Sequence, residues 1–158
     1  MISSNHVKKS YPIIKPVILL IAFSILGFLI YSNVLNGEFV SDDYNLVLNN
    51  YPIRNIQNTS AIWQSLKTRF IPVLTFALNY HFHKFNVFGY HLVNIFIHLI
   101  NAFLVFYFTF LTFRASNFKI NEDFSRNSFL CSVLCAGIYL CHPIQTQAVS
   151  FITQRIVL

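Results

Sequence analysis

Two adjacent carboxylates, Asp42 and Asp43, are the residues in this sequence with the clearest chemical potential. They stand in the stretch Glu38–Asn50, which holds three of the chain's five acidic residues and follows a long apolar run. Paired carboxylates can act as a general base, as ligands of a divalent cation such as Mg²⁺ or Mn²⁺, or as both. Alternatively they are solvated loop residues, and Ser41 or Asp42 caps the helix that follows.

The composition is that of an integral membrane protein. Of the 158 residues, 55% are hydrophobic and 17% aromatic, and only 10% are charged, whereas a soluble domain carries roughly 25% charged residues. The net charge of +6 does not indicate nucleic-acid binding, because the basic residues are thinly spread and flank apolar runs. Basic residues in such places set membrane topology and face lipid headgroups. The lipid bilayer is therefore an expected partner, and nucleic acid is not.

Apolar runs predict about three membrane-spanning helices, over residues 13–33, 90–113 and 128–141. The first is about 20 residues long, as a bilayer requires, and no small-residue cleavage site follows it, so we expect a retained span. The third is short for a span. The predicted fold class is all-α, a polytopic helical membrane protein.

Residues 34–89 form a large loop between the first two spans, and two short helices are expected in it. Ser60 can cap a helix that runs to Lys67, and a second helix covers Phe70 to His83, with Pro72 in its first turn, where the missing N–H costs nothing. The apolar run of this second helix is too short to span a bilayer and suits the membrane interface.

The second predicted span carries polar residues on one helical face, namely His91, Asn94, His98 and Asn101. Polar side chains inside a bilayer are costly unless they face protein or a water-filled cavity. We therefore expect this face to pack by hydrogen bonds against other helices.

Basic residues predict the orientation of the chain. Short segments that carry them stay in the cytoplasm, and these residues are Lys8, Lys9, Lys15, Arg114, Lys119 and Arg126. The loop with Asp42 and Asp43 is then extracytoplasmic, and His142 and Arg155 lie on the same side.

Four segments in order, residues 37–44, 69–80, 89–102 and 142–155, resemble the N-terminal part of GT-C superfamily glycosyltransferases. The closer resemblance is to O-mannosyltransferase-like membrane proteins with C-terminal tetratricopeptide repeats, including their bacterial branch. This resemblance implies transfer of a sugar from a polyprenyl-phosphate donor to a protein or other acceptor on the extracytoplasmic face. It also implies a location in a membrane, which we expect to be the bacterial inner membrane.

By the same resemblance, Asp42 or Asp43 is the catalytic acid or base and can help to hold a divalent cation, while Arg69, His142 and Arg155 lie near the donor phosphate. A carboxylate can deprotonate an acceptor hydroxyl, and the planar fork of arginine suits phosphate. Alternatively, Arg155 anchors a helix at headgroup level, and His142 only ends a helix before Pro143.

The sequence also departs from this pattern. The superfamily fold needs many more spanning helices, and the tetratricopeptide repeats are absent, so we expect a fragment of a longer protein that is inactive by itself. The rival hypothesis is a non-catalytic membrane subunit or anchor that packs on partner helices through the His/Asn face. A weaker third hypothesis is a transporter fragment, because it too would carry polar residues within the membrane.

Overall fold

The computed structural model describes residues 14–115 and 127–156, and in these ranges every regular element is helical. The predicted all-α class is confirmed for the described part of the chain. Four of the basic residues used to predict topology, Lys8, Lys9, Lys119 and Arg126, lie outside the described residues.

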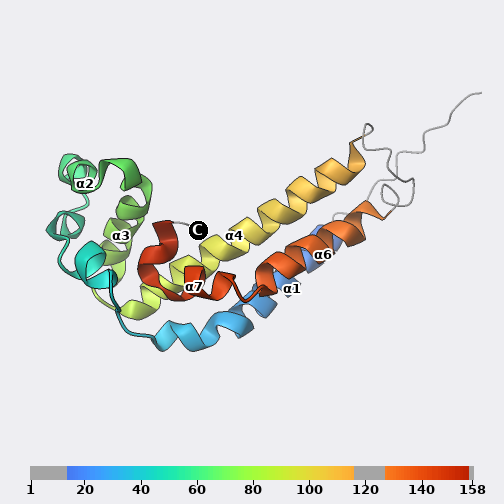
Figure 1. Cartoon of the computed structure of the whole chain (residues 1–158), viewed down its shortest axis with the longest axis horizontal. Helices are drawn as coiled ribbons and strands as arrows, with labels where there is room; N and C mark the ends of the chain where they lie inside the picture. The colour runs from blue at the N-terminus through green and yellow to red at the C-terminus, as the bar shows by residue number, and fades with distance from the viewer. Residues whose placement is uncertain (1–13, 116–126, 157–158) are drawn as a thin grey trace, which may run out of the picture.

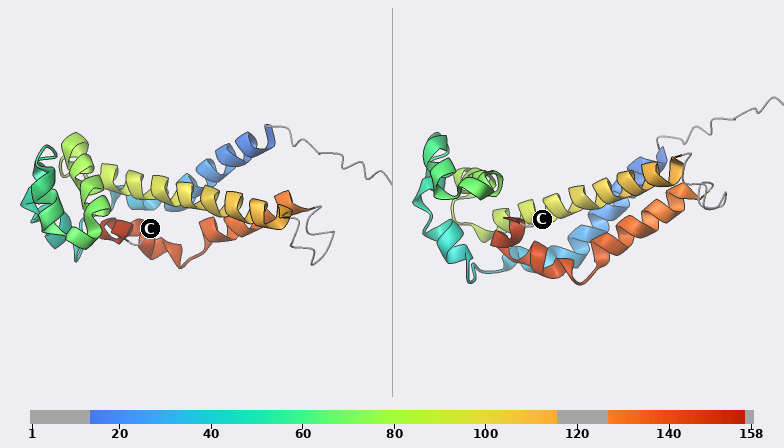
Figure 2. Two further views of the ribbon diagram at one scale, coloured as in Figure 1. Left: turned by 90° about the horizontal axis from the view of Figure 1, so that it is seen from above. Right: turned by 45° about the horizontal axis from the view of Figure 1, so that its top comes forward.

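Three helices run side by side along the length of the molecule, α1 (Ile14–Tyr31), α4 (Val87–Arg114) and α6 (Ser128–Cys141) (Figure 1). α1 runs toward the end that holds α2 and α3, α4 runs away from it, and α6 returns (Figure 2). Their shared core is built from one pair of buried side chains on each helix, namely Leu19 and Phe23, Ala102 and Phe106, and Ala136 and Leu140.

Two of these helices are long and apolar enough to cross a membrane. One candidate span is Val17–Asn36, which joins α1 to the short helix η1 (Ser32–Asn36), and the other is the whole of α4 with 28 residues. The 14 residues of α6 cover roughly 21 Å at 1.5 Å per residue, less than the roughly 30 Å of a bilayer core. The third predicted span is therefore a shorter apolar helix in the described residues.

The outer faces of the three helices carry large apolar side chains. Leu29 of α1, Phe108 of α4 and Ile138 of α6 are each at least 65% exposed. Extended exposed apolar surface of this kind marks contact with lipid or with further protein. It agrees with a membrane-embedded helix bundle.

A group of short helices caps one end of the bundle (Figure 1). It consists of η2 (Tyr44–Leu48), η3 (Tyr51–Arg54), α2 (Thr59–Ser65), η4 (Lys67–Arg69) and α3 (Phe70–His83). The predicted helix over 70–83 is confirmed with both of its ends. The predicted cap of the preceding helix is wrong, because Asn58, not Ser60, accepts the backbone N–H of Ala61 at 3.1 Å.

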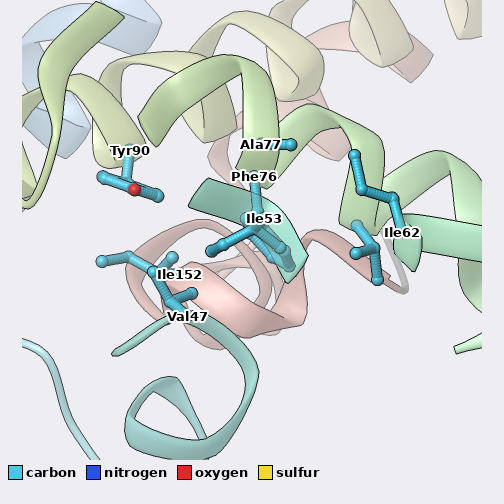
Figure 3. Packing of buried hydrophobic residues seen from close by; sticks show 8 residues of the cluster. Val47, Ile53, Ile62, Phe76, Ala77, Tyr90 and Ile152 are labelled. Atoms are coloured by element: carbon cyan, nitrogen blue, oxygen red, sulfur yellow. The ribbon is translucent and has the colours of Figure 1, made fainter. Parts of the chain in front are cut away.

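The end of the chain completes this cap. After α6, α7 (Gln145–Ser150) and η5 (Ile152–Ile156) fold back against the first turns of α4. Ile152 is fully buried in the cap's core (Figure 3), together with Val47, Ile53, Ile62, Val73, Phe76, Ala77 and Tyr90. The loop after α1 and the segment after α6 therefore share one hydrophobic core, although about a hundred residues separate them in the sequence.

Candidate active site

Asp43 is a fully buried carboxylate in the loop between η1 and η2. Its Oδ2 accepts the backbone N–H of Val40 at 3.0 Å, and its Oδ1 accepts the backbone N–H of Thr153 at 3.0 Å. The second bond joins positions 110 residues apart in the sequence. Both carboxylate oxygens are thus used to hold the loop after α1 to the segment after α6.

Asp42 differs from its neighbour, because its side chain is exposed. Its backbone carbonyl accepts the N–H groups of Asn45 and Leu46, which begin the turn of η2. Ser41 precedes it with a φ of 50°, a left-handed conformation uncommon outside glycine that is often found at functional sites. The alternative in which Ser41 or Asp42 caps the following helix is wrong for η2, whose N-cap is Asp43 and makes no side-chain capping bond.

Arg155 lies in η5 and is only 5% exposed. Its guanidinium donates four hydrogen bonds of 2.7–3.1 Å, to Oδ1 of Asn94, Oδ1 of Asn79, Oγ1 of Thr75 and the carbonyl of Tyr90. The ring of Phe76 lies 4.7 Å from the guanidinium carbon, at cation–π distance. Four of its five N–H groups are therefore bonded to protein acceptors.

Burial also acts on the charge of this residue. It lowers the pKa of the Arg155 guanidinium from its ordinary value to about 9, because the charged form loses hydration. The side chain remains protonated at neutral pH even so. A buried cation of this kind is tolerated where several oxygen acceptors replace water, and the four acceptors around Arg155 do so.

The polar face of α4 packs against the end of the same chain. The Asn94 side-chain amide lies 3.1–3.4 Å from the carbonyls of Val149, Phe151 and Ile152, while its oxygen accepts from Arg155. One turn further along, Nε2 of His98 lies 3.3 Å from the carbonyl of Leu140.

The other two members of this face are placed differently. His91 is 2% exposed, and neither of its ring nitrogens has a hydrogen-bond partner among the described residues. Its ring lies against the chain at Gly37, where an added Cβ would stand 3.1 Å from Nε2. Asn101 is half-buried.

Arg69 and His142, the remaining predicted phosphate-binding residues, are both exposed. Arg69 is the last residue of η4, directly before α3. His142 follows α6, and its Nδ1 accepts the backbone N–H of Ile144 at 3.2 Å. Of the three predicted phosphate-binding residues, Arg69 and His142 are therefore exposed, and Arg155 is buried.

Among residues 14–115 and 127–156, no group of three or more His, Cys, Asp or Glu is placed to hold a metal ion. Asp43 is fully buried and both its oxygens accept backbone N–H groups, so Asp42 is the member of the pair that is exposed to a cation from solvent. Protein-built sites for Mg²⁺ and similar ions use more oxygen ligands than this.

Two side chains of the Arg155 cluster were missed in the sequence. Thr75 and Asn79 stand four apart in the apolar helix α3 and so lie on one face of it. That spacing, in a helix otherwise rich in Phe and Leu, is a signal that could have predicted them. The Thr153 bond to Asp43 uses a backbone N–H, for which a sequence gives no signal.

The fold and the site describe a helical protein with two helices fit to cross a membrane and a polar cluster where they meet a folded cap. The chain is similar to two curated proteins. It is 32% identical over 155 residues to a protein O-mannosyl-transferase of Caenorhabditis elegans, covering 90% of this chain and 21% of that protein. It is 31% identical over 148 residues to protein O-mannosyl-transferase Tmtc1 of Drosophila melanogaster, covering 84% of this chain and 15% of that protein.

The chain thus spans about a fifth or less of the length of the curated relatives it matches. No family model and no solved structure matches it. These similarities support a relationship to the O-mannosyltransferase-like proteins. Both relatives are animal proteins, and the bacterial branch and the bacterial inner membrane stay predictions.

Proposed function

We propose that the chain is part of a membrane glycosyltransferase that moves a sugar from a polyprenyl-phosphate donor to a hydroxyl of a protein acceptor, on the extracytoplasmic face. The similarity to two protein O-mannosyl-transferases supports the reaction class and suggests mannose as the sugar. The observation that carries the proposal is the division of the acidic pair into a buried, doubly bonded Asp43 and an exposed Asp42.

Asp42 is the residue proposed to act as the general base. It would accept the proton of the acceptor hydroxyl while the acceptor oxygen forms a bond to the anomeric carbon of the sugar. The bond between that carbon and the phosphate oxygen breaks, and the polyprenyl phosphate leaves with the bonding electron pair. A positioned carboxylate contributes about 10²–10⁴-fold to such a proton transfer.

Arg69 and His142 are proposed to lie near the departing phosphate. Both side chains are exposed and can meet a lipid-linked phosphate at the membrane surface. The charge of Arg69 would stabilise the developing negative charge, and His142 would donate a hydrogen bond to the phosphate. Where a divalent cation takes part, Asp42 would hold it, and the cation would neutralise charge on the phosphate.

The helix directions support the proposed orientation. α1 ends near the cap, and α4 starts there and ends at Arg114, at the opposite end of the bundle (Figure 2). A bilayer crossed by both helices separates Arg114 from Asp42, and a basic residue at the end of a span favours the cytoplasmic side. The exposed apolar faces of the bundle suit lipid and further helices as partners.

The rival hypothesis of a non-catalytic anchor loses support. It needs the polar face of α4 to be free for partner helices. Asn94 and His98 are instead fully buried, and their side chains lie within hydrogen-bond distance of the carbonyls of Phe151 and Leu140 of the same chain.

The test compares Asp42→Asn with Glu38→Gln, which removes another exposed carboxylate from the same loop. Transfer of radiolabelled mannose from polyprenyl-phosphate mannose to protein is measured with the full-length protein in membranes. We expect Asp42→Asn to lower transfer about 100-fold or more at unchanged membrane insertion, and Glu38→Gln to keep it. Full transfer by Asp42→Asn would overturn the assignment.

A further inference from the structure

We propose that Arg155 is a positioning residue of the transfer site, which orients Asp42 by holding the segment that binds Asp43. This inference rests on the proposed function. It changes the role expected for Arg155 from a ligand of the donor phosphate to a residue that holds η5 in place.

The guanidinium of Arg155 joins two helices to its own segment. Its donors reach α3 through Thr75 and Asn79, and α4 through Asn94 and the carbonyl of Tyr90. Arg155 itself belongs to η5. A forked, planar donor with four acceptors on two helices has little freedom to move, so η5 is fixed against both α3 and α4.

Arg155 is linked to the acidic pair through Thr153. Thr153 is two residues away in the same short helix, and its backbone N–H donates to Oδ1 of Asp43 at 3.0 Å. The other carboxylate oxygen accepts the N–H of Val40. Asp43 is therefore held on one side by its own loop and on the other by the helix that Arg155 fixes.

Asp42 lies between Ser41 and Asp43, whose carboxylate is fixed by two hydrogen bonds. The left-handed backbone at Ser41, with a φ of 50°, costs energy and persists where the surroundings fix it. The two hydrogen bonds of Asp43 supply that restraint. They fix the backbone next to Asp42, whose carboxylate is exposed.

The same contacts argue against a phosphate ligand. Within the described residues, only one guanidinium N–H of Arg155 is left without a protein acceptor, so a bidentate phosphate contact would have to displace a bonded acceptor in a buried position. Arg69 is exposed and has no such requirement, which makes it the matched control.

The experiment measures transfer kinetics against the concentration of polyprenyl-phosphate mannose for Arg155→Lys and Arg69→Lys in the full-length protein. Lysine keeps the charge and loses the forked hydrogen bonds. We expect Arg155→Lys to lower kcat at least 10-fold with donor KM within about 2-fold, because a misplaced catalytic group affects the chemical step. We expect Arg69→Lys to raise donor KM. A raised donor KM at unchanged kcat for Arg155→Lys would overturn the inference.

A second measurement is independent of activity. Thermal unfolding of the purified protein is compared for Arg155→Lys, Asp43→Asn and the double variant. Because the inference links the two residues through η5, Asp43→Asn should lower Tm clearly less in the Arg155→Lys background. Additive shifts would refute the link. If Arg155→Lys does not fold, Thr75→Val, which removes one acceptor, replaces it in both measurements.

The two measurements separate the inference from the proposed function. If the Tm shifts of the variants are non-additive but the wild-type protein transfers no sugar, the proposed function is overturned and the link between Arg155 and Asp43 stands. If the Tm shifts are additive and the wild-type protein transfers sugar, the link is overturned and the proposed function stands.

Discussion

Replacing Asn94 by alanine should destabilise the folded protein by about 2.5–6 kcal/mol, the sum of one charged and two neutral hydrogen bonds. This side chain is fully buried and bonds in two directions. Its oxygen accepts from the charged Arg155 at 2.7 Å, a type of bond worth about 1.5–3 kcal/mol. Its two N–H groups serve at most two of three nearby carbonyls at a time, and each such bond contributes about 0.5–1.5 kcal/mol.

The assay is reversible denaturation of the purified protein in mixed detergent micelles. Thr112→Ala is the control on the same helix, because Thr112 is half-buried and its hydroxyl donates to the carbonyl of Phe108 at 2.9 Å in an exposed hydrogen bond. Substitutions that remove an exposed hydrogen bond of this kind stay within about 0.5 kcal/mol. If Asn94→Ala destabilised the protein no more than Thr112→Ala, the network around Arg155 would not hold the end of the chain to α4.

Three smaller predictions concern the helix contacts. Gly137→Ala should stabilise the protein by about 0.5–1 kcal/mol, since nothing lies within 4 Å of an added Cβ. Gly89→Ala should instead destabilise it by about 1–3 kcal/mol, since its Cβ would stand 2.5 Å from Cγ of His83; equal effects in thermal unfolding would contradict this contact. Tyr31→Phe removes the hydroxyl that donates to the carbonyl of Leu140 at 3.3 Å and should cost about 0.5–1.5 kcal/mol, and an unchanged midpoint in the same assay would count against that bond.

The helices were predictable where apolar periodicity and end signals agree. The limits of α3, Phe70–His83, match the prediction, because Pro72 falls in its first turn and polar residues surround the apolar run. α4 begins at Val87, three residues before the predicted start. The Asn86 side chain accepts the N–H of Phe88 at 3.1 Å and caps the helix there, a signal that Gly89 obscured in the sequence.

The roles of Asp42 and Asp43 could not be separated from the sequence. The two residues are identical and adjacent, so composition and spacing treat them alike. Their difference depends on the backbone turn at Ser41 and on the N–H of Thr153, far away in the chain. A local sequence pattern contains neither of these.

Arg155 shows a different limit. The family resemblance implied a phosphate ligand, and the alternative was a headgroup anchor. Both interpretations assume that the charged side chain is exposed to water. The structure buries it among Thr75, Asn79 and Asn94. These partners come from helices that only the tertiary fold brings together.

The burial of Arg155 has a consequence for how the cap is specified. Burying a charge is costly, and a hydrogen-bonded buried charge often adds little net stability over well-packed apolar residues. Its acceptors on α3 and α4 must nevertheless all be in place for the cation to be tolerated. An arrangement of the cap and helices that lacked any of these acceptors would leave a buried charge without a hydrogen-bond partner. The apolar contacts of the cap's core, by contrast, tolerate small shifts. The cluster therefore acts mainly to select one arrangement of the cap, and that arrangement is the one that holds Asp43 and exposes Asp42.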